Sequence, residues 1–182
     1  MKEVERRFLV KNVDNIDLSK FEKKEIQQYY LYRDKIVTVR KRKVTLDNGD
    51  TLYFHTVKYR PGEEKFPEEF EVQITEEKYE NLKINKDTHS IEKTRYIIPV
   101  NQFSGYEKYS TPVIELDIFE GYLKGLIFAE IEFSDENIAR NFVPMPWFDV
   151  ELTHKLTNGK MTRMSRLEID ELIEKIRKES SK

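Results

Sequence analysis

The chain has 182 residues, of which 36% are charged and 38% hydrophobic, and it contains no cysteine. Its 32 lysines and arginines nearly balance 34 aspartates and glutamates, which argues against a nucleic-acid partner, because a general nucleic-acid coat needs a basic excess. Without cysteine there is no disulfide, thiolate nucleophile or cysteine zinc site. No run of apolar residues reaches the length of a signal segment or a membrane span. We therefore expect a single cytoplasmic α+β domain over residues 1–182.

The first predicted strand sets a pattern that recurs along the chain. Successive side chains of an extended strand point to opposite faces. Glu3, Glu5 and Arg7 therefore lie on one face, whereas Val4 and Phe8 lie on the other. We expect this strand to have one charged side and one apolar side.

In chain order, the alternation and the turn residues predict strands at residues 3–10, 25–33, 35–44, 51–59, 68–74, 90–100, 104–109, 112–120 and 126–133. Asn48-Gly49 is typical of a hairpin turn. Helices are predicted after Thr75 and after Ser134, because a residue that can cap a helix is followed there by acidic residues. Apolar residues at helical spacing predict a C-terminal helix over about 165–179.

Several strands carry two like charges two residues apart. These pairs are Glu3 and Glu5, Arg40 and Arg42, Glu69 and Glu71, Lys93 and Arg95, Glu115 and Asp117, and Glu130 and Glu132. For any single strand, the plain interpretation is a solvated sheet face with cross-strand ion pairs. Like charges at this spacing repel, so the whole set favours a face that binds ligands of opposite sign. We expect a closed antiparallel β-barrel of about eight strands that forms a polar tunnel, with helices packed on the outside.

The charges of this interior indicate which ligands it takes. Burying an unpaired charge costs several kcal/mol, so a dry interior is excluded. Carboxylate oxygens without histidine or cysteine suit a hard divalent cation such as Mg²⁺. Arginine binds phosphate with two parallel hydrogen bonds, which suits a run of phosphoryl groups.

The motifs also resemble a known family. Glu3-Val4-Glu5-Arg6-Arg7 resembles the Glu-x-Glu-x-Lys signature of the CYTH superfamily, also called triphosphate tunnel metalloenzymes. The resemblance continues collinearly over most of the chain, through residues 38–42, 56–58, 69–71, 92–96, 114–121, 126–133, 146–147 and 151–153. It implies a closed tunnel that binds a triphosphate together with Mg²⁺ or Mn²⁺.

The resemblance also implies roles for individual residues. The expected catalytic residues are Glu3, Glu5, Arg7, Glu130 and Glu132. The expected phosphate-binding residues are Arg7, Arg40, Arg42, Lys58, Lys93 and Arg95. Metal ligands are expected among Glu3, Glu5, Glu130 and Glu132. A second set either completes another metal site or pairs with the basic residues, and its members are Glu69, Glu71, Glu115 and Asp117.

The chain departs from the signature at Arg7, which stands where the family has lysine, and at Gln73, where relatives often have a third glutamate. Residues 155–166 fit the family's closing segment poorly, so Lys155, Arg163 and Arg166 are further candidate contributors. We expect a metal-dependent hydrolase of inorganic, nucleoside or other organic triphosphates, monomeric or homodimeric. The alternatives are an adenylate cyclase and a catalytically poor binder of polyphosphate or nucleotides. An arginine that cannot give up its proton favours the binder.

Overall fold

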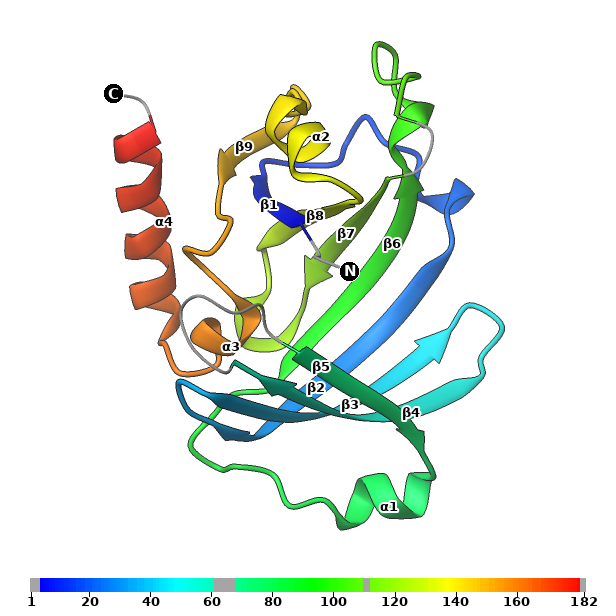
Figure 1. The fold of residues 1–182 in the computed structure, drawn as a ribbon, viewed down its shortest axis with the longest axis vertical. Helices are drawn as coiled ribbons and strands as arrows, with labels where there is room; N and C mark the ends of the chain where they lie inside the picture. Colours follow the sequence, from blue (N-terminus) through cyan, green and yellow to red (C-terminus); the bar gives the residue numbers. More distant parts are fainter. Residues whose placement is uncertain (1–3, 61–67, 110–111, 181–182) are drawn as a thin grey trace.

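The computed structural model describes residues 4–60, 68–109 and 112–180. One antiparallel sheet of nine strands dominates the fold, in the order β5-β4-β3-β2-β6-β7-β8-β1-β9 (Figure 1). The strands are β1 Val4–Val10, β2 Lys23–Arg33, β3 Val37–Leu46, β4 Thr51–Tyr59, β5 Glu68–Ile74, β6 Ile91–Pro99, β7 Val113–Phe119, β8 Ile127–Phe133 and β9 Phe148–Glu151. The helices are α1 Glu76–Asn81, α2 Glu136–Asn141, α3 Asn158–Met161 and α4 Arg166–Ser180. Single 3-10 turns lie at Leu18–Lys20, Val100–Gln102 and Gly121–Leu123.

The sheet is not closed, so the predicted closed β-barrel of about eight strands is wrong. Within the described residues, β5 and β9 are edge strands, and each pairs with one neighbour. Strand β9 pairs with β1, with Phe8 opposite Glu151, and so extends the sheet by one strand. Closure would require β9 to pair with β5 at the other edge, and the described strands do not form this pair. The sheet instead curves strongly, so that its lower strands, β2 to β5, face its upper strands, β1 and β6 to β8 (Figure 1).

Strands β1 to β8 lie where strands are predicted, and the hairpin between β3 and β4 turns at Gly49, which has a φ of 88°. The predicted strand at 104–109 is wrong. Gly105 has a φ of 86° there, which breaks an extended chain. The segment forms turns, and Tyr106 and Tyr109 pack on Phe142 with ring centroids 5.8 and 5.3 Å apart.

Helices α1 and α2 cover the outer, apolar face of the sheet, as predicted. An outward-pointing cation fixes the last carbonyls of each helix. Lys41 donates hydrogen bonds to the carbonyls of Tyr79 (2.9 Å) and Leu82 (3.0 Å) at the end of α1. Arg6 donates to those of Ala139 (3.0 Å) and Phe142 (2.8 Å) at the end of α2. Cations at these positions satisfy carbonyls that have no partner within the helix.

Helix α4 does not pack on the outside of the sheet as expected. Its buried residues Ile169, Ile173 and Ile176 join a core that contains Leu9, Phe119 and Phe128. Each of the strand residues Leu9, Phe119 and Phe128 lies two positions from a charged residue of its own strand, so it shares the charged face of the sheet. The charged residues are Arg7, Asp117 and Glu130, respectively. The inner face therefore has an apolar end, which α3 and α4 cover. None of the described helices is long and apolar enough to cross a membrane.

Candidate functional site

The strand register places the described candidate residues on one face of the sheet. Directly opposed residues of neighbouring strands share a face. In the upper strands, Arg7 is opposite Glu130, Glu130 is opposite Glu115, and Arg95 is opposite Asp117. We call this surface the inner face. Glu3 lies outside the described residues.

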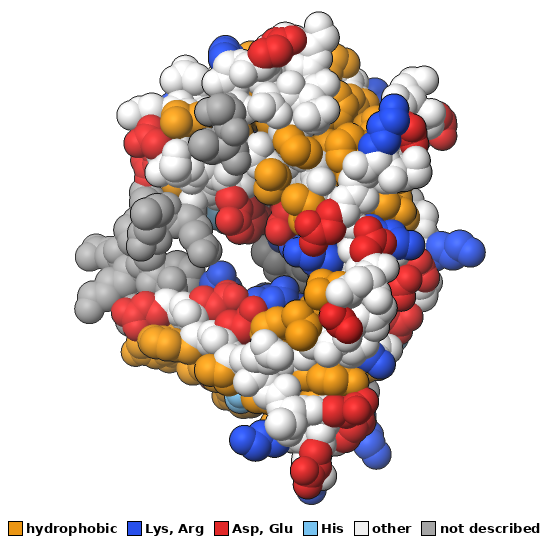
Figure 2. Space-filling model, turned by 90° about the vertical axis from the view of Figure 1, so that its right-hand side faces the viewer, with side chains coloured by type: hydrophobic (Ala, Val, Ile, Leu, Met, Phe, Trp, Pro, Cys, Tyr) orange, Lys and Arg blue, Asp and Glu red, His pale blue; other side chains and the backbone are white. Residues whose placement is uncertain are grey.

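The same face continues through the lower strands. Gln28 of β2 lies opposite Arg42, Arg40 lies opposite Thr56, and Thr56 lies opposite Glu71. Lys58 lies opposite Glu69. Acidic and basic side chains accordingly gather around a hollow between the lower and upper strands (Figure 2). The predicted charged face is therefore present, although it belongs to an open sheet.

Arg95 is the centre of a buried network in the upper strands. Its guanidinium group contacts Asp117 (Nε to Oδ1, 2.6 Å), Glu130 (Nη2 to Oε2, 3.1 Å) and Glu115. Lys93 forms an ion pair with the other oxygen of Asp117. Burial raises the pKa of Asp117, but the charges of Arg95 and Lys93 outweigh this effect and lower it to about 2. Asp117 and Glu115 thus pair with basic residues in this structure.

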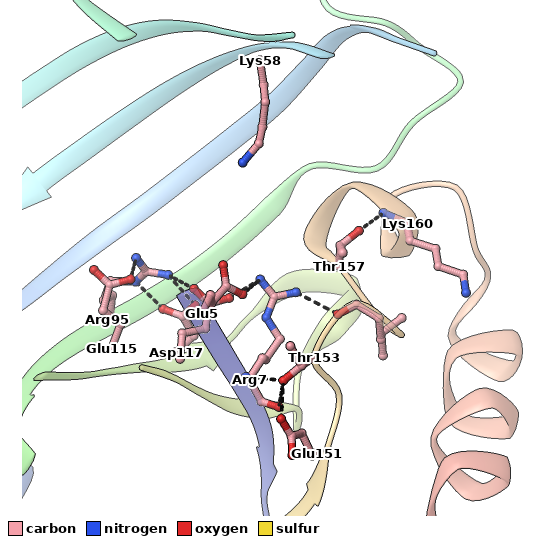
Figure 3. A network of polar contacts seen from close by, with 12 residues as sticks. Glu5, Arg7, Lys58, Arg95, Glu115, Asp117, Glu151, Thr153, Thr157 and Lys160 are labelled. Carbon is pink, nitrogen blue, oxygen red and sulfur yellow. Dashed lines mark hydrogen bonds and ion pairs between the residues drawn. The ribbon is translucent and has the colours of Figure 1, made fainter. Parts of the chain in front are cut away.

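Arg7 bridges two parts of the site. Its guanidinium group forms ion pairs with Glu130 and Glu5 (Nη2 to Oε1 of Glu5, 3.2 Å) and donates a hydrogen bond from Nη1 to the carbonyl of Leu156 at 2.8 Å (Figure 3). Its main-chain N–H donates to Thr153 Oγ1 at 2.9 Å. The forked guanidinium reaches a carboxylate and a carbonyl in different directions, which suits arginine better than the compact ammonium group of lysine.

Two carboxylates of the site are open to solvent. Glu5 and Glu132 oppose each other across β1 and β8, and the Glu5 side chain is 42% exposed. Partial loss of hydration and the nearby carboxylate of Glu130 raise the pKa of Glu5. Within the described part of the chain, no three acidic or histidine side chains stand close enough together to hold a metal ion as they are placed.

The ion pairs of the lower strands are more exposed. Arg40 contacts Glu69 and Arg42 contacts Glu71, both at 2.7 Å, and Lys58 lies 3.4 Å from Glu69. Arg42 also lies over the ring of Phe54, 5.4 Å from its centroid. The Lys58 side chain points across the hollow toward the upper strands that carry Glu5 (Figure 3). Glu69 and Glu71, like Glu115, pair with cations here.

Comparisons with known proteins place this arrangement in a family. No protein-family model matches the sequence. The chain is 33% identical over 157 residues to the inorganic triphosphatase of Nitrosomonas europaea, covering 84% of this chain and 90% of that protein. The chain belongs to the family of this inorganic triphosphatase. It also resembles two crystal structures of the protein NE1496, one described as an inorganic triphosphatase (TM-score 0.64) and one as a hypothetical protein (TM-score 0.63). Both are 28% identical and cover 90% of this chain, which spans 96% and 99% of theirs.

Strand alternation in the sequence did not predict two further cations of the inner face, Arg33 and Arg60. A bulge between Tyr30 and Tyr32 shifts the register of β2, so Arg33 lies opposite Thr38, while Tyr30 lies opposite Arg40. Because Thr38 and Arg40 share a face, Tyr30 and Arg33 share it too, which strict alternation forbids. Arg60 follows the last residue of β4, where the alternation ends.

The three candidate residues near the C-terminus, Lys155, Arg163 and Arg166, lie in different surroundings. Arg163 donates a hydrogen bond to the main-chain carbonyl of Arg33 at 2.7 Å, beside the inner face. Arg166 contacts Asp170 at 2.9 Å and the carbonyl of Lys124 at 2.6 Å, and Lys155 is exposed. Of these three residues, only Arg163 lies beside the additional inner-face cations Arg33 and Arg60.

Proposed function

We propose that this protein hydrolyses a triphosphate bound along the inner face, with inorganic tripolyphosphate as the preferred substrate. The observation that carries the proposal is the family relationship, which spans 90% of a protein described as an inorganic triphosphatase. The collinear motifs support the further proposal that this family is part of the CYTH superfamily. A cyclase reaction has no such support.

The lower strands supply the proposed phosphate contacts. The side chains of Arg40 and Arg42 are 22% and 21% exposed, and each already contacts a carboxylate. A polyphosphate that enters the hollow offers stronger acceptors to the same guanidinium groups. Phosphoryl transfer depends mainly on positioning and on neutralising charge on the phosphoryl oxygens. Arg40, Arg42 and Lys58 are the proposed residues for both tasks.

The proposal includes a divalent cation, Mg²⁺ or Mn²⁺. Glu5, Glu130 and Glu132, joined by Glu3, would hold it, and when bound it neutralises phosphate charge and activates water. Their oxygen donors have the chemistry that these ions prefer. The raised pKa of Glu5 supports this choice, because burial and the neighbouring carboxylate of Glu130 both disfavour its negative charge, which a bound cation would offset. Arg7 is a positioning residue here, since it holds Glu130 and cannot act as a base.

The test is to incubate the purified protein with tripolyphosphate, ATP or thiamine triphosphate, each with Mg²⁺, Mn²⁺ or a chelator. We expect phosphate release from tripolyphosphate that requires the cation and exceeds release from the organic triphosphates. Cyclic AMP formed from ATP would instead indicate the cyclase. Tight binding without turnover of any substrate would contradict the proposal and support the binder.

A further inference from the structure

Three arginines that the proposed reaction does not use lie together at one end of the inner face. Arg33 ends β2, Arg60 follows β4, and Arg163 follows α3. Arg163 donates to the main-chain carbonyl of Arg33 at 2.7 Å. Arg60 Nη1 donates to Thr38 Oγ1 at 3.3 Å, and Thr38 is the cross-strand partner of Arg33. We call these three residues the arginine cluster.

The cluster differs from the other inner-face arginines in its partners. Arg7, Arg40, Arg42 and Arg95 each form an ion pair with a carboxylate. Among the residues that the structure describes, no carboxylate lies within ion-pairing distance of any member of the cluster. Burial lowers the pKa of Arg33, and although Tyr30 acts in the opposite direction, repulsion from Arg163 and Arg60 also lowers it. A bound anion would relieve this repulsion.

The position of Arg33 is also shaped by its neighbours. Its guanidinium group packs directly on buried Gly159 of α3, where an added Cβ would lie 2.5 Å from Arg33 Nη1. Any larger residue at position 159 would therefore displace this group. The glycine leaves room for a cation at this point.

The cluster continues the row of proposed phosphate contacts. On the inner face of β3, Arg42 and Arg40 are followed by Thr38, which lies between Arg33 on β2 and Lys58 on β4. Neighbouring inner-face positions on a strand are about 6.6 Å apart. A phosphate chain that runs along Arg42, Arg40 and Lys58 and extends further in that direction meets the cluster next.

We propose that Arg33, Arg60 and Arg163 form an additional phosphate subsite, which binds the units of a linear polyphosphate beyond the three phosphates of tripolyphosphate. This inference rests on the proposed function, because it extends the same binding face. It assigns a substrate class, inorganic polyphosphates of four or more units, for which the protein has a higher affinity than for tripolyphosphate.

The experiment compares the binding of tripolyphosphate and tetrapolyphosphate to the full-length protein by titration calorimetry, without divalent cation and at fixed ionic strength. We expect Arg33→Gln and Arg163→Gln to weaken tetrapolyphosphate binding about tenfold, because each removes a charge-assisted contact. Tripolyphosphate binding should change less than twofold. Arg140→Gln is the matched control. Arg140 lies on α2 with its side chain 75% exposed, and the substitution removes the same charge at a distance from the cluster.

Gly159→Ala gives a second variant that keeps every charge. Its methyl group should displace the Arg33 guanidinium group and weaken tetrapolyphosphate binding selectively, by about threefold. Equal weakening of both ligands by Arg33→Gln, or no weakening beyond that of Arg140→Gln, would overturn the subsite.

Hydrolysis of tripolyphosphate by the unmodified protein separates this inference from the proposed function. Hydrolysis without selective binding effects rejects the subsite alone. Selective effects without hydrolysis support the subsite and reject the catalytic proposal.

Discussion

The upper and lower halves of the inner face carry similar charges in different surroundings. In the upper half, Lys93 and Asp117 are buried, and the outer side of the same strands is packed in an apolar core that includes Ile114 and Ile131. In the lower half, the ion pairs of Arg40 and Arg42 are partly exposed. Breaking a buried pair leaves an uncompensated charge, whereas an exposed pair contributes little. The same alternation therefore serves structure in one half and leaves cations available for exchange with a ligand in the other.

The largest effect is expected from Asp117→Asn, which removes the shared partner of Lys93 and Arg95. We expect the free energy of unfolding to fall by about 3 to 5 kcal/mol, measured by urea denaturation. Glu69→Gln is the matched change in the lower half and should cost less than about 1 kcal/mol. Similar losses in the two variants would remove the contrast between the halves.

The pH dependence of stability should show the same contrast. The pKa of Asp117 is about 2 in the folded protein and 3.8 ordinarily, so its contribution is fully present above about pH 4 and is lost as the pH falls toward 2. At about 1.36 kcal/mol per pH unit, the contribution is about 2 kcal/mol. Thermal unfolding from pH 6 to pH 2 measures it. Asp117→Asn should lose less stability over this range than the unmodified protein does, and an unchanged slope would contradict the assignment.

A smaller effect, of about tenfold, is expected for activity in the lower half. Arg42→Gln should reduce kcat/KM for tripolyphosphate by about this factor while the free energy of unfolding changes by less than about 1 kcal/mol. Arg140→Gln controls for the loss of one positive charge. A loss of stability as large as that of Asp117→Asn would mean that Arg42 is structural and that the lower half is not the more exchangeable one.

Sequence periodicity predicted which residues share the inner face, because a period of two is preserved wherever the register is regular. It failed at the bulge in β2, since one extra residue brings Arg33 to the face of Tyr30. Sequence periodicity also could not predict whether the sheet closes into a barrel. Alternating apolar and charged residues fit a closed barrel and a strongly curved open sheet equally well. Closure depends on whether the two edge strands pair, and one of them, β9, has only four residues, Phe148–Glu151, which carry too short a pattern to be recognised.

The position of α4 illustrates a second limit. Its apolar stripe predicted a helix that covers hydrophobic residues, and this is confirmed. The stripe does not say which apolar surface is covered. Leu9, Phe119 and Phe128 continue the charged face at one end, so they provide an inner surface that competes with the outer one. Similarly, the register brings acidic and basic positions together across the strands, but their ion-pair partners depend on side-chain geometry.

The smallest effect is expected on the outer face of the lower half. Phe70 and Val72 on edge strand β5 are 62% and 55% exposed, whereas Ile131 of the upper half is fully buried. Phe70→Ser should therefore change the free energy of unfolding by less than about 0.5 kcal/mol, while Ile131→Ala should cost about 2 to 5 kcal/mol. Urea denaturation at several protein concentrations measures both changes. A large, concentration-independent loss for Phe70→Ser would mean that this residue is buried in the folded chain, and the contrast between the halves would then hold only for their charges.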